Sequence, residues 1–180
     1  MENKTLSSKD IIVNYGLILG FATVILSVIT YLLNMPLEIG WISGLLGIII
    51  MISIIVIGIK KFRANNNQSL SLGEALKIGL GIAVIGGIIA SIYQLIFLTY
   101  IDPEYITRVQ ELQLEKALEQ NPDMPDEQIE MIKKMGETTS SPWISFAGAL
   151  IGNLFFGFII SLIGGLILKR DNPNKEVDQL

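Results

Sequence analysis

The chain has 180 residues, of which 51% are apolar, and its formal net charge at neutral pH is −4. It contains no cysteine and no histidine, which excludes disulfides, thiolate nucleophiles, and zinc, iron–sulfur or histidine-ligated haem sites. No basic stripe of the kind that follows a phosphate backbone is present, so we expect no nucleic-acid partner and no cofactor.

Four long apolar segments dominate the sequence, and Lys77 is the only formally charged residue within them. A bilayer core about 30 Å thick requires roughly 20 helical residues, so each segment is long enough to span it, the second only just. The predicted spans are residues 11–33, 41–59, 75–101 and 143–168. We therefore predict an all-α polytopic membrane protein, a single four-span domain over residues 1–180, with the lipid bilayer as its solvent.

Residue patterns typical of helix N-termini precede predicted helices. Two are capping boxes, in which a serine and an acid three residues later satisfy each other's backbone N–H groups. Two more place a capping side chain before a proline at the first helical position. The four pairs are Ser7 with Asp10, Ser71 with Glu74, Asp102 with Pro103, and Ser141 with Pro142.

The segment between the third and fourth spans, residues 102–142, is acidic, with ten acids and four bases. Apolar residues recur at helical spacing over residues 103–120 and again over 126–136, on either side of the break at Asn121–Pro125. This pattern predicts a small amphipathic helical hairpin that is too short to fold alone.

The distribution of Lys and Arg predicts the orientation, because acids contribute little to topology. The two terminal segments, the loop between spans two and three, and the adjoining start of span three hold nine bases, against four in the acidic insertion. We therefore expect both termini to be cytoplasmic and the insertion to be extracytoplasmic. The nine are Lys4, Lys9, Lys60, Lys61, Arg63, Lys77, Lys169, Arg170 and Lys175.

Small residues recur at intervals of four along the spans. In lipid there is little hydrophobic drive between helices, so close backbone approach at small residues supplies the packing. Packing within the bundle is the favoured interpretation, and self-association or a mobile interface is the alternative. The candidate packing residues are Gly16, Gly20, Gly79, Ala83, Gly87, Gly148 and Gly152, with Gly40, Ser43, Gly44 and Gly47 in the second span and Gly157, Ser161 and Gly165 in the fourth.

Two amide side chains fall within the hydrocarbon region. Asn153 lies about 15 Å into the fourth span, and Gln94 lies about 10 Å below the outer surface. Both amides need hydrogen-bond partners, so both are predicted to face the bundle interior. Interhelical hydrogen bonds worth about 0.6 kcal/mol each are the favoured interpretation, and a small-solute site that includes Tyr93 is the alternative.

The sequence offers no arrangement typical of a catalytic centre. No histidine is present to act as a base for Ser27, Ser91 or Ser161, and neither an HExxH motif nor paired intramembrane carboxylates occur. The acids of the insertion lack the pattern of a calcium-binding loop. The absence of Asp, Glu and Arg from the hydrocarbon disfavours proton-coupled transport and leaves passive conduction through an oligomer open.

We therefore expect a non-enzymatic integral membrane protein without catalytic, cofactor-binding or metal-binding residues. The favoured function is contact with proteins or lipids, as a homo-oligomer or with another membrane protein. The alternative is a small-solute channel or transporter subunit in which Gln94, Asn153 and Tyr93 line the path.

Three stretches of the sequence, taken in their order and spacing, resemble those of a known protein family. They are Tyr15–Gly20 in the first span, Leu70–Gly79 at the start of the third, and Ile92–Tyr93 followed by Ile101–Pro103. Over nearly the whole chain the sequence resembles the bacterial four-helix membrane proteins grouped as domain of unknown function 4199. The resemblance implies a multi-pass protein of the cell inner membrane and supplies no activity, substrate or catalytic residue.

Overall fold

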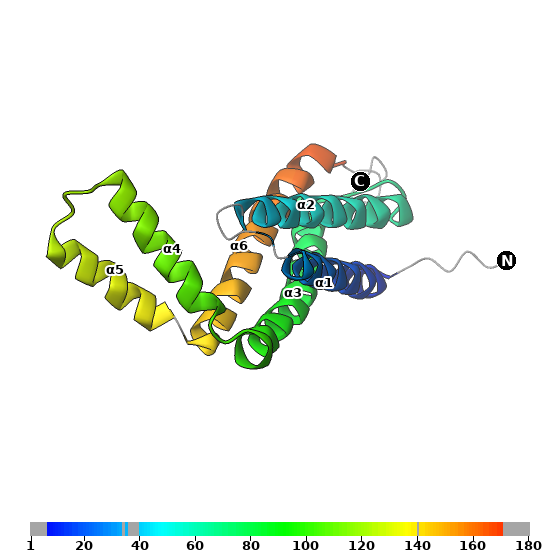
Figure 1. The fold of residues 1–180 in the computed structure, drawn as a ribbon. Coiled ribbons are helices and arrows are strands. Elements are labelled where there is room, and N and C mark those ends of the chain that lie inside the picture. Colours follow the sequence, from blue (N-terminus) through cyan, green and yellow to red (C-terminus); the bar gives the residue numbers. More distant parts are fainter. Residues whose placement is uncertain (1–6, 34, 36–39, 140, 171–180) are drawn as a thin grey trace.

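The computed structural model describes residues 7–33, 35, 40–139 and 141–170. Four of its helices are long and apolar enough to cross a membrane: α1, α2, α3 with the π-helical turn η2 that continues it, and α6. The fold class predicted from the sequence, all-α with four spans, is confirmed (Figure 1). The elements are α1 (Ser8–Leu32), α2 (Gly40–Asn65), α3 (Leu72–Ile96), η2 (Phe97–Ile101), α4 (Tyr105–Gln120), α5 (Asp126–Thr139) and α6 (Pro142–Leu168).

Both predicted capping boxes are present. At the start of α1, the Asp10 backbone N–H donates to Ser7 Oγ (3.2 Å), and the Ser7 N–H donates to Asp10 Oδ2 (3.0 Å). The same exchange joins Ser71 and Glu74 before α3, at 3.2 and 2.8 Å. Each box satisfies two backbone donors that a helix start otherwise leaves unpaired.

The two proline signals have different outcomes. Ser141 is the N-cap residue of α6, as predicted, although its side chain makes no capping hydrogen bond. The prediction that Asp102 caps the following helix is wrong, because α4 begins at Tyr105 with Glu104 in the N-cap position. The Asp102 carboxylate instead accepts a hydrogen bond from Arg108 Nη2 at 2.5 Å, which takes it away from the backbone of the first turn.

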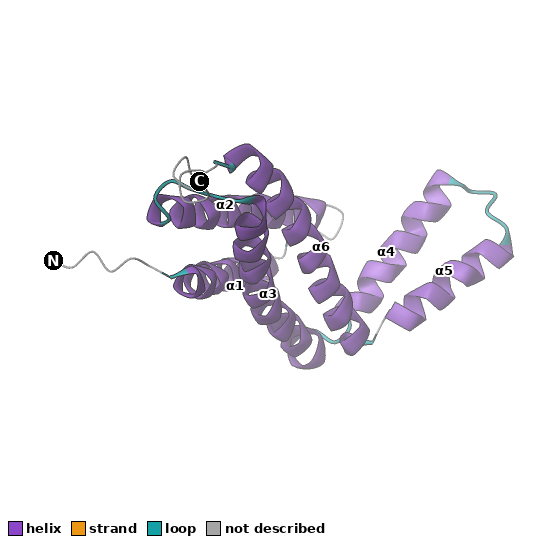
Figure 2. Ribbon diagram, turned by 180° about the vertical axis from the view of Figure 1, so that it is seen from behind, coloured by secondary structure: helices purple, strands orange, loops and turns teal. Residues whose placement is uncertain are grey.

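The four spanning helices form a bundle, and α3 contacts α1, α2 and α6. At one end, which we call the basic end, α1 and α3 begin and α2 and α6 end. At the other end, the arm end, α4 and α5 lie side by side and extend away from the bundle (Figures 1 and 2). Gln110 Nε2 of α4 donates to the Gly136 carbonyl of α5 at 2.6 Å and so ties the two arm helices together.

A seam of small residues joins α3 to α6. Gly79 lies against Ser161, Ala83 against Gly157, and Gly87 against Asn153, so the register advances by four residues at each step. The Ser161 side chain leaves no room for a Cβ on Gly79, and a Cβ on Gly165 would lie 2.8 Å from the Cβ of Ala75. The two backbones therefore approach as closely as the absence of side chains allows.

Glycines also bring α1 against α3, in a different arrangement. A Cβ on Gly16 would lie 2.6 Å from Ile85 Cβ, and one on Gly20 would lie 2.7 Å from Ile89 Cβ. In the opposite direction, Leu19 of α1 lies against Gly86 of α3. Branched side chains on one helix thus occupy the spaces that glycines leave on the other.

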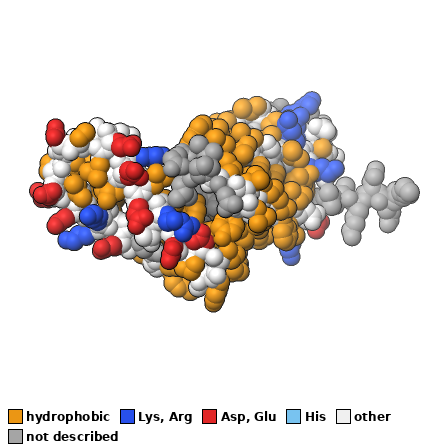
Figure 3. Space-filling view, viewed as in Figure 1, with side chains coloured by type: hydrophobic (Ala, Val, Ile, Leu, Met, Phe, Trp, Pro, Cys, Tyr) orange, Lys and Arg blue, Asp and Glu red, His pale blue; other side chains and the backbone are white. Residues whose placement is uncertain are grey.

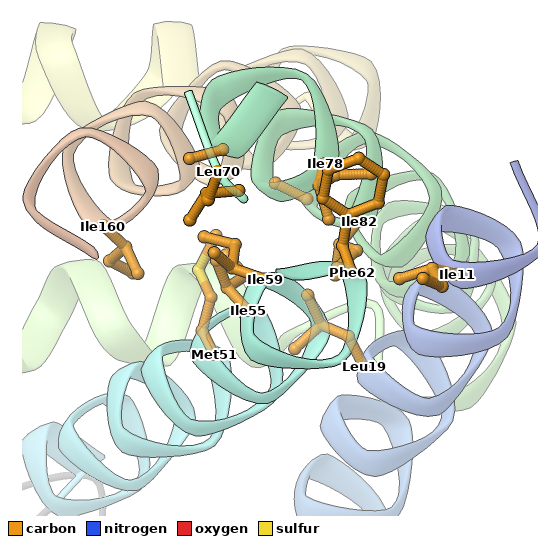
Figure 4. Packing of buried hydrophobic residues seen from close by; sticks show 12 residues of the cluster. Ile11, Leu19, Met51, Ile55, Ile59, Phe62, Leu70, Ile78, Ile82 and Ile160 are labelled. Carbon is orange, nitrogen blue, oxygen red and sulfur yellow. The ribbon is translucent and has the colours of Figure 1, made fainter. Parts of the chain in front are cut away.

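A buried apolar cluster fills the bundle toward the basic end (Figure 4). Two connections close this end: Leu70 and Arg170 exchange backbone hydrogen bonds of 2.9 and 3.0 Å, and Arg63 Nη1 donates to the Leu168 carbonyl at 3.3 Å. The cluster consists of Ile11, Leu19, Met51, Ile55, Ile59, Phe62, Leu70, Ala75, Ile78, Ile82, Ala83 and Ile160.

Large apolar side chains also cover the outside of the bundle, where Phe21, Ile57, Phe155 and Ile163 are exposed. On the face drawn in Figure 3, hydrophobic side chains spread over the bundle, while Asp and Glu are concentrated on the arm. A continuous apolar exterior of this kind is stable in lipid rather than in water.

The seam predicts unequal effects of two matched glycine substitutions. Gly79→Val should lower the free energy of unfolding by about 1–3 kcal/mol, because its side chain must displace Ser161 and Ile55. Gly148→Val, also in a spanning helix, should leave the free energy of unfolding nearly unchanged, because no described atom lies within 4 Å of a Cβ added at this position. Unfolding by denaturant in detergent micelles measures both, and equal losses would contradict the seam.

Candidate functional site

A cavity of about 630 Å³ lies in the half of the bundle next to the arm. All four spanning helices contribute to its lining, together with residues of the corner between α3 and α4. The tight seam and the apolar cluster occupy the other half, so the bundle is packed at one end and hollow at the other. The cavity is therefore the candidate functional site.

The α1 wall of the cavity presents hydroxyl groups. Thr23, Ser27 and Thr30 all line it, at a spacing that places them on one helix face. Thr23 Oγ1 donates to the Leu19 carbonyl and Thr30 Oγ1 donates to the Ser27 carbonyl, both at 2.9 Å. A hydroxyl that donates its hydrogen bond to the backbone keeps its lone pairs, so these two hydroxyls can accept hydrogen bonds from a ligand.

The α2 wall is a helix face that carries almost no side chains. Gly40, Ser43, Gly44 and Gly47 line the cavity, and a Cβ added to any of the three glycines would meet nothing within 4 Å in the described part of the chain. From the sequence, these small residues were interpreted as helix-packing positions, whereas in the structure they line the cavity. They hold open a space instead of closing one.

The opposite wall combines α3 and α6, beyond the point where the seam ends. Ser91, Gln94 and Tyr93 line it from α3, and Asn153 lines it from α6. Asn153 Nδ2 donates to the Ala149 carbonyl of its own helix at 3.0 Å, so its hydrogen bond is not the interhelical one that the sequence favoured. The Ser91 hydroxyl is fully buried, and among the described residues it has no hydrogen-bond partner.

An aromatic cluster and one ion pair form the arm side of the cavity. The ring of Phe97 contacts those of Tyr31, Tyr93 and Tyr105, with centroid distances of 5.1, 6.1 and 5.5 Å. Phe97 begins the π-helical turn η2, a wide turn of a type frequent at functional sites. These contacts fix the first turn of α4 against the ends of α1 and α3.

Arg108 and Asp102 are the only charged residues in the cavity lining that the structure describes. The hydrogen bond from Arg108 to Asp102 raises the pKa of the guanidinium further above its already high value. Arg108 therefore stays protonated at every physiological pH, and its charge is balanced at the cavity edge by Asp102.

The residues singled out from the sequence fall into three places. Gln94, Asn153 and Tyr93 meet at the cavity. Gly16 and Gly20 lie against α3, and Gly79, Ala83 and Gly87 lie in the seam. Gly148 and Gly152 have nothing described within 4 Å of an added Cβ, so α6 packs on α3 through its later small residues.

Sequence reasoning missed several members of the lining. Thr23 and Thr30 were not among the predicted site residues, and Ser27 and Ser91 were considered only as nucleophiles without a base. The spacing of Thr23, Ser27 and Thr30, at four and then three residues, nevertheless indicated a polar helix face. The ion pair between Asp102 and Arg108, six residues apart across a turn, has no sequence signal of its own.

The family described as Protein of unknown function (DUF4199) matches residues 14–170 of this chain. The chain belongs to this family. The matched region contains every residue of the cavity lining, from Thr23 to Asn153, so the cavity lies within the part of the chain that defines the family. No curated protein and no solved structure matches the chain.

The natural absence of cysteine allows a direct test of cavity access. A Thr23→Cys variant should react with a hydrophilic thiol reagent about tenfold or more faster than Ser53→Cys, because a thiol on an apolar surface has a raised pKa and forms less thiolate. Both positions lie at least two turns inside their helices, but Thr23 lines the cavity and Ser53 is exposed outside it. Labelling rates in lipid nanodiscs measure the difference, and equal rates would contradict a hydrated cavity.

Proposed function

We propose that this protein is a non-enzymatic, multi-pass membrane protein that holds a small solute in its cavity, as a channel or transporter subunit. One observation supports this function over the others. Hydroxyl and amide side chains from all the spanning helices meet in a cavity of about 630 Å³, a volume typical of small-molecule sites. The sequence alone favoured protein or lipid contacts, and the cavity changes that preference.

The energetics of polar groups in lipid support this proposal. A polar group in hydrocarbon is costly unless it finds a partner, so helices held together only for stability bring such groups into contact with one another. Here Ser91 has no partner among the described residues, and the α2 glycines leave the space in front of the polar walls open. A solute, or water that a solute replaces, would supply the missing hydrogen bonds.

The nature of the cavity groups favours binding over catalysis. The uncharged polar groups of the lining are hydroxyls and amides, none of which ionises near neutral pH. A hydroxyl acts as a nucleophile only when a neighbouring base activates it, and the described lining places its one carboxylate, Asp102, in an ion pair with Arg108. These features support a non-enzymatic role.

The proposed location is the bacterial inner membrane, with the termini and the basic end in the cytoplasm and the arm outside. Lys60, Lys61 and Arg63 close α2 at the basic end, as the distribution of bases in membrane proteins requires on the cytoplasmic side. Lys4 and Lys175, which entered the same count, lie outside the described residues. At the arm end, Trp41, Tyr100 and Trp143 are 67%, 80% and 68% exposed, which suits aromatic residues at a membrane interface.

A second candidate function, contact with a second copy or another membrane protein, is favoured by one face of α6. Gly148 and Gly152 lie one turn apart, and nothing described approaches within 4 Å of an added Cβ at either position. Such a pair is suited to the close approach of a helix from another chain.

A double substitution separates the two candidate functions. Gln94→Leu combined with Asn153→Leu should reduce solute flux to the level of protein-free vesicles, because it removes both cavity amides and fills part of the space. Swelling of proteoliposomes in glycerol and urea gradients measures the flux at matched protein content. Ser53→Leu, outside the cavity, is the control and should retain the flux. Unaltered flux with only a change in thermal stability would favour the contact function.

Reporter fusions test the orientation. Alkaline phosphatase is active only outside the cytoplasm, so fusion after Gln120, at the end of α4, should be active and fusion after Arg63 inactive. The reverse pattern would place the arm in the cytoplasm and overturn the proposed orientation.

A further inference from the structure

We infer that the cavity is a binding site for a small, uncharged solute that donates hydrogen bonds, with polyols and sugars as its chemical class. This inference rests on the proposed function and names the ligand of the same site. It follows from the hydrogen-bond state of four polar groups on the cavity walls rather than from the number of polar groups.

Three groups on two facing walls act as acceptors. On α1, the hydroxyls of Thr23 and Thr30 each donate a hydrogen bond to a carbonyl of their own helix. Asn153 on α6 donates one of its two amide N–H groups to the Ala149 carbonyl, and its side-chain oxygen can accept a hydrogen bond. A ligand with several O–H or N–H groups can therefore pair with all three of these acceptors.

Ser91 provides a fourth, uncommitted group. Ser53 and Ser161 each donate to the carbonyl four residues earlier in their helices, at 2.7 and 2.5 Å. Ser91 lies in a helix in the same way and is as buried as Ser161, yet its hydroxyl has no partner among the described residues. The Ser91 side chain has no exposed surface in this structure, so a bound hydroxyl group pairs with it only after the side chain rotates toward the cavity. Because leaving a buried hydroxyl unpaired is costly, that pairing would increase the affinity.

The charges at the site disfavour ions. Arg108 and Asp102 neutralise each other at the cavity edge, and no other charged side chain is present in the described lining. An anion would lose its hydration without a free cation in the described lining, and a cation would lose its hydration without a free carboxylate there. A neutral molecule with several hydroxyl groups avoids both costs, and its C–H faces suit the apolar lining at Val24 and Leu98.

Saturation-transfer NMR of the full chain in phosphatidylcholine nanodiscs tests the ligand class with defined probes. The probes are xylitol, which donates hydrogen bonds, 1,2-dimethoxyethane, which only accepts them, and the ions acetate and methylammonium. Xylitol should receive saturation from the protein, and the other three should not.

Two pairs of variants locate the binding. Gly47→Leu places a side chain in the open space on the α2 wall and should abolish the xylitol signal, whereas Gly148→Leu, equally open but outside the cavity, should retain it. Ser91→Ala should weaken xylitol binding about two- to tenfold, the effect of one hydrogen bond. Ser161→Ala, equally buried but outside the cavity, should not.

The possible results separate the two proposals. Saturation of 1,2-dimethoxyethane or of an ion as strong as that of xylitol, and lost in Gly47→Leu, would overturn the ligand class and leave the cavity as a solute site. A xylitol signal that is equal in Gly47→Leu and the unsubstituted chain, or the absence of a signal for all four probes, would overturn the solute site itself.

Discussion

The close approach of α3 and α6 is the contact on which the rest of the bundle depends. In lipid, apolar side chains gain little by turning toward one another, so helices associate where their backbones come near enough for extensive van der Waals contact. The row formed by Ala75, Gly79, Ala83 and Gly87 permits this on α3, and the matching row on α6 completes it. Because α3 also receives Leu19 of α1 against Gly86, it is the helix around which the other spans are placed.

The same row explains where the cavity begins. Asn153 is the first large residue that α6 brings to the seam, opposite Gly87, and one turn further along α3 the fully buried Ser91 belongs to the cavity wall. On the far side, the glycines of α2 supply no side chains to fill the gap. Small residues therefore have two opposite effects in this molecule. Between α3 and α6 they bring helices together, and on α2 they leave a space.

Much of the fold was predictable from the sequence, because it depends on local rules. The four apolar spans and the capping boxes at Ser7 and Ser71 are each set by residues close together in the chain, and their presence was confirmed. The role of Asp102 was not predictable, because its partner Arg108 reaches it only once α4 has turned back toward the bundle. The inward orientation of Gln94 and Asn153 followed from the cost of amides in lipid, but the cavity in front of them depends on which helix faces which. The spacing of Gly40, Gly44 and Gly47, at four and then three residues, is the same whether the neighbour is a helix or an open space.

The uneven filling of the bundle has a mechanical consequence for the surrounding membrane. Because the hollow half lies next to the arm, closing the cavity would shrink the cross-section of the protein in only one leaflet of the bilayer. The packed half, which contains the cluster around Ile55 and Ile59, would keep its cross-section in the other leaflet. Lateral pressure in the leaflet beside the arm would therefore favour the closed form, and loss of that pressure would favour the open one. If a bound solute holds the cavity open, lipid composition on that side of the membrane would be coupled to its occupancy.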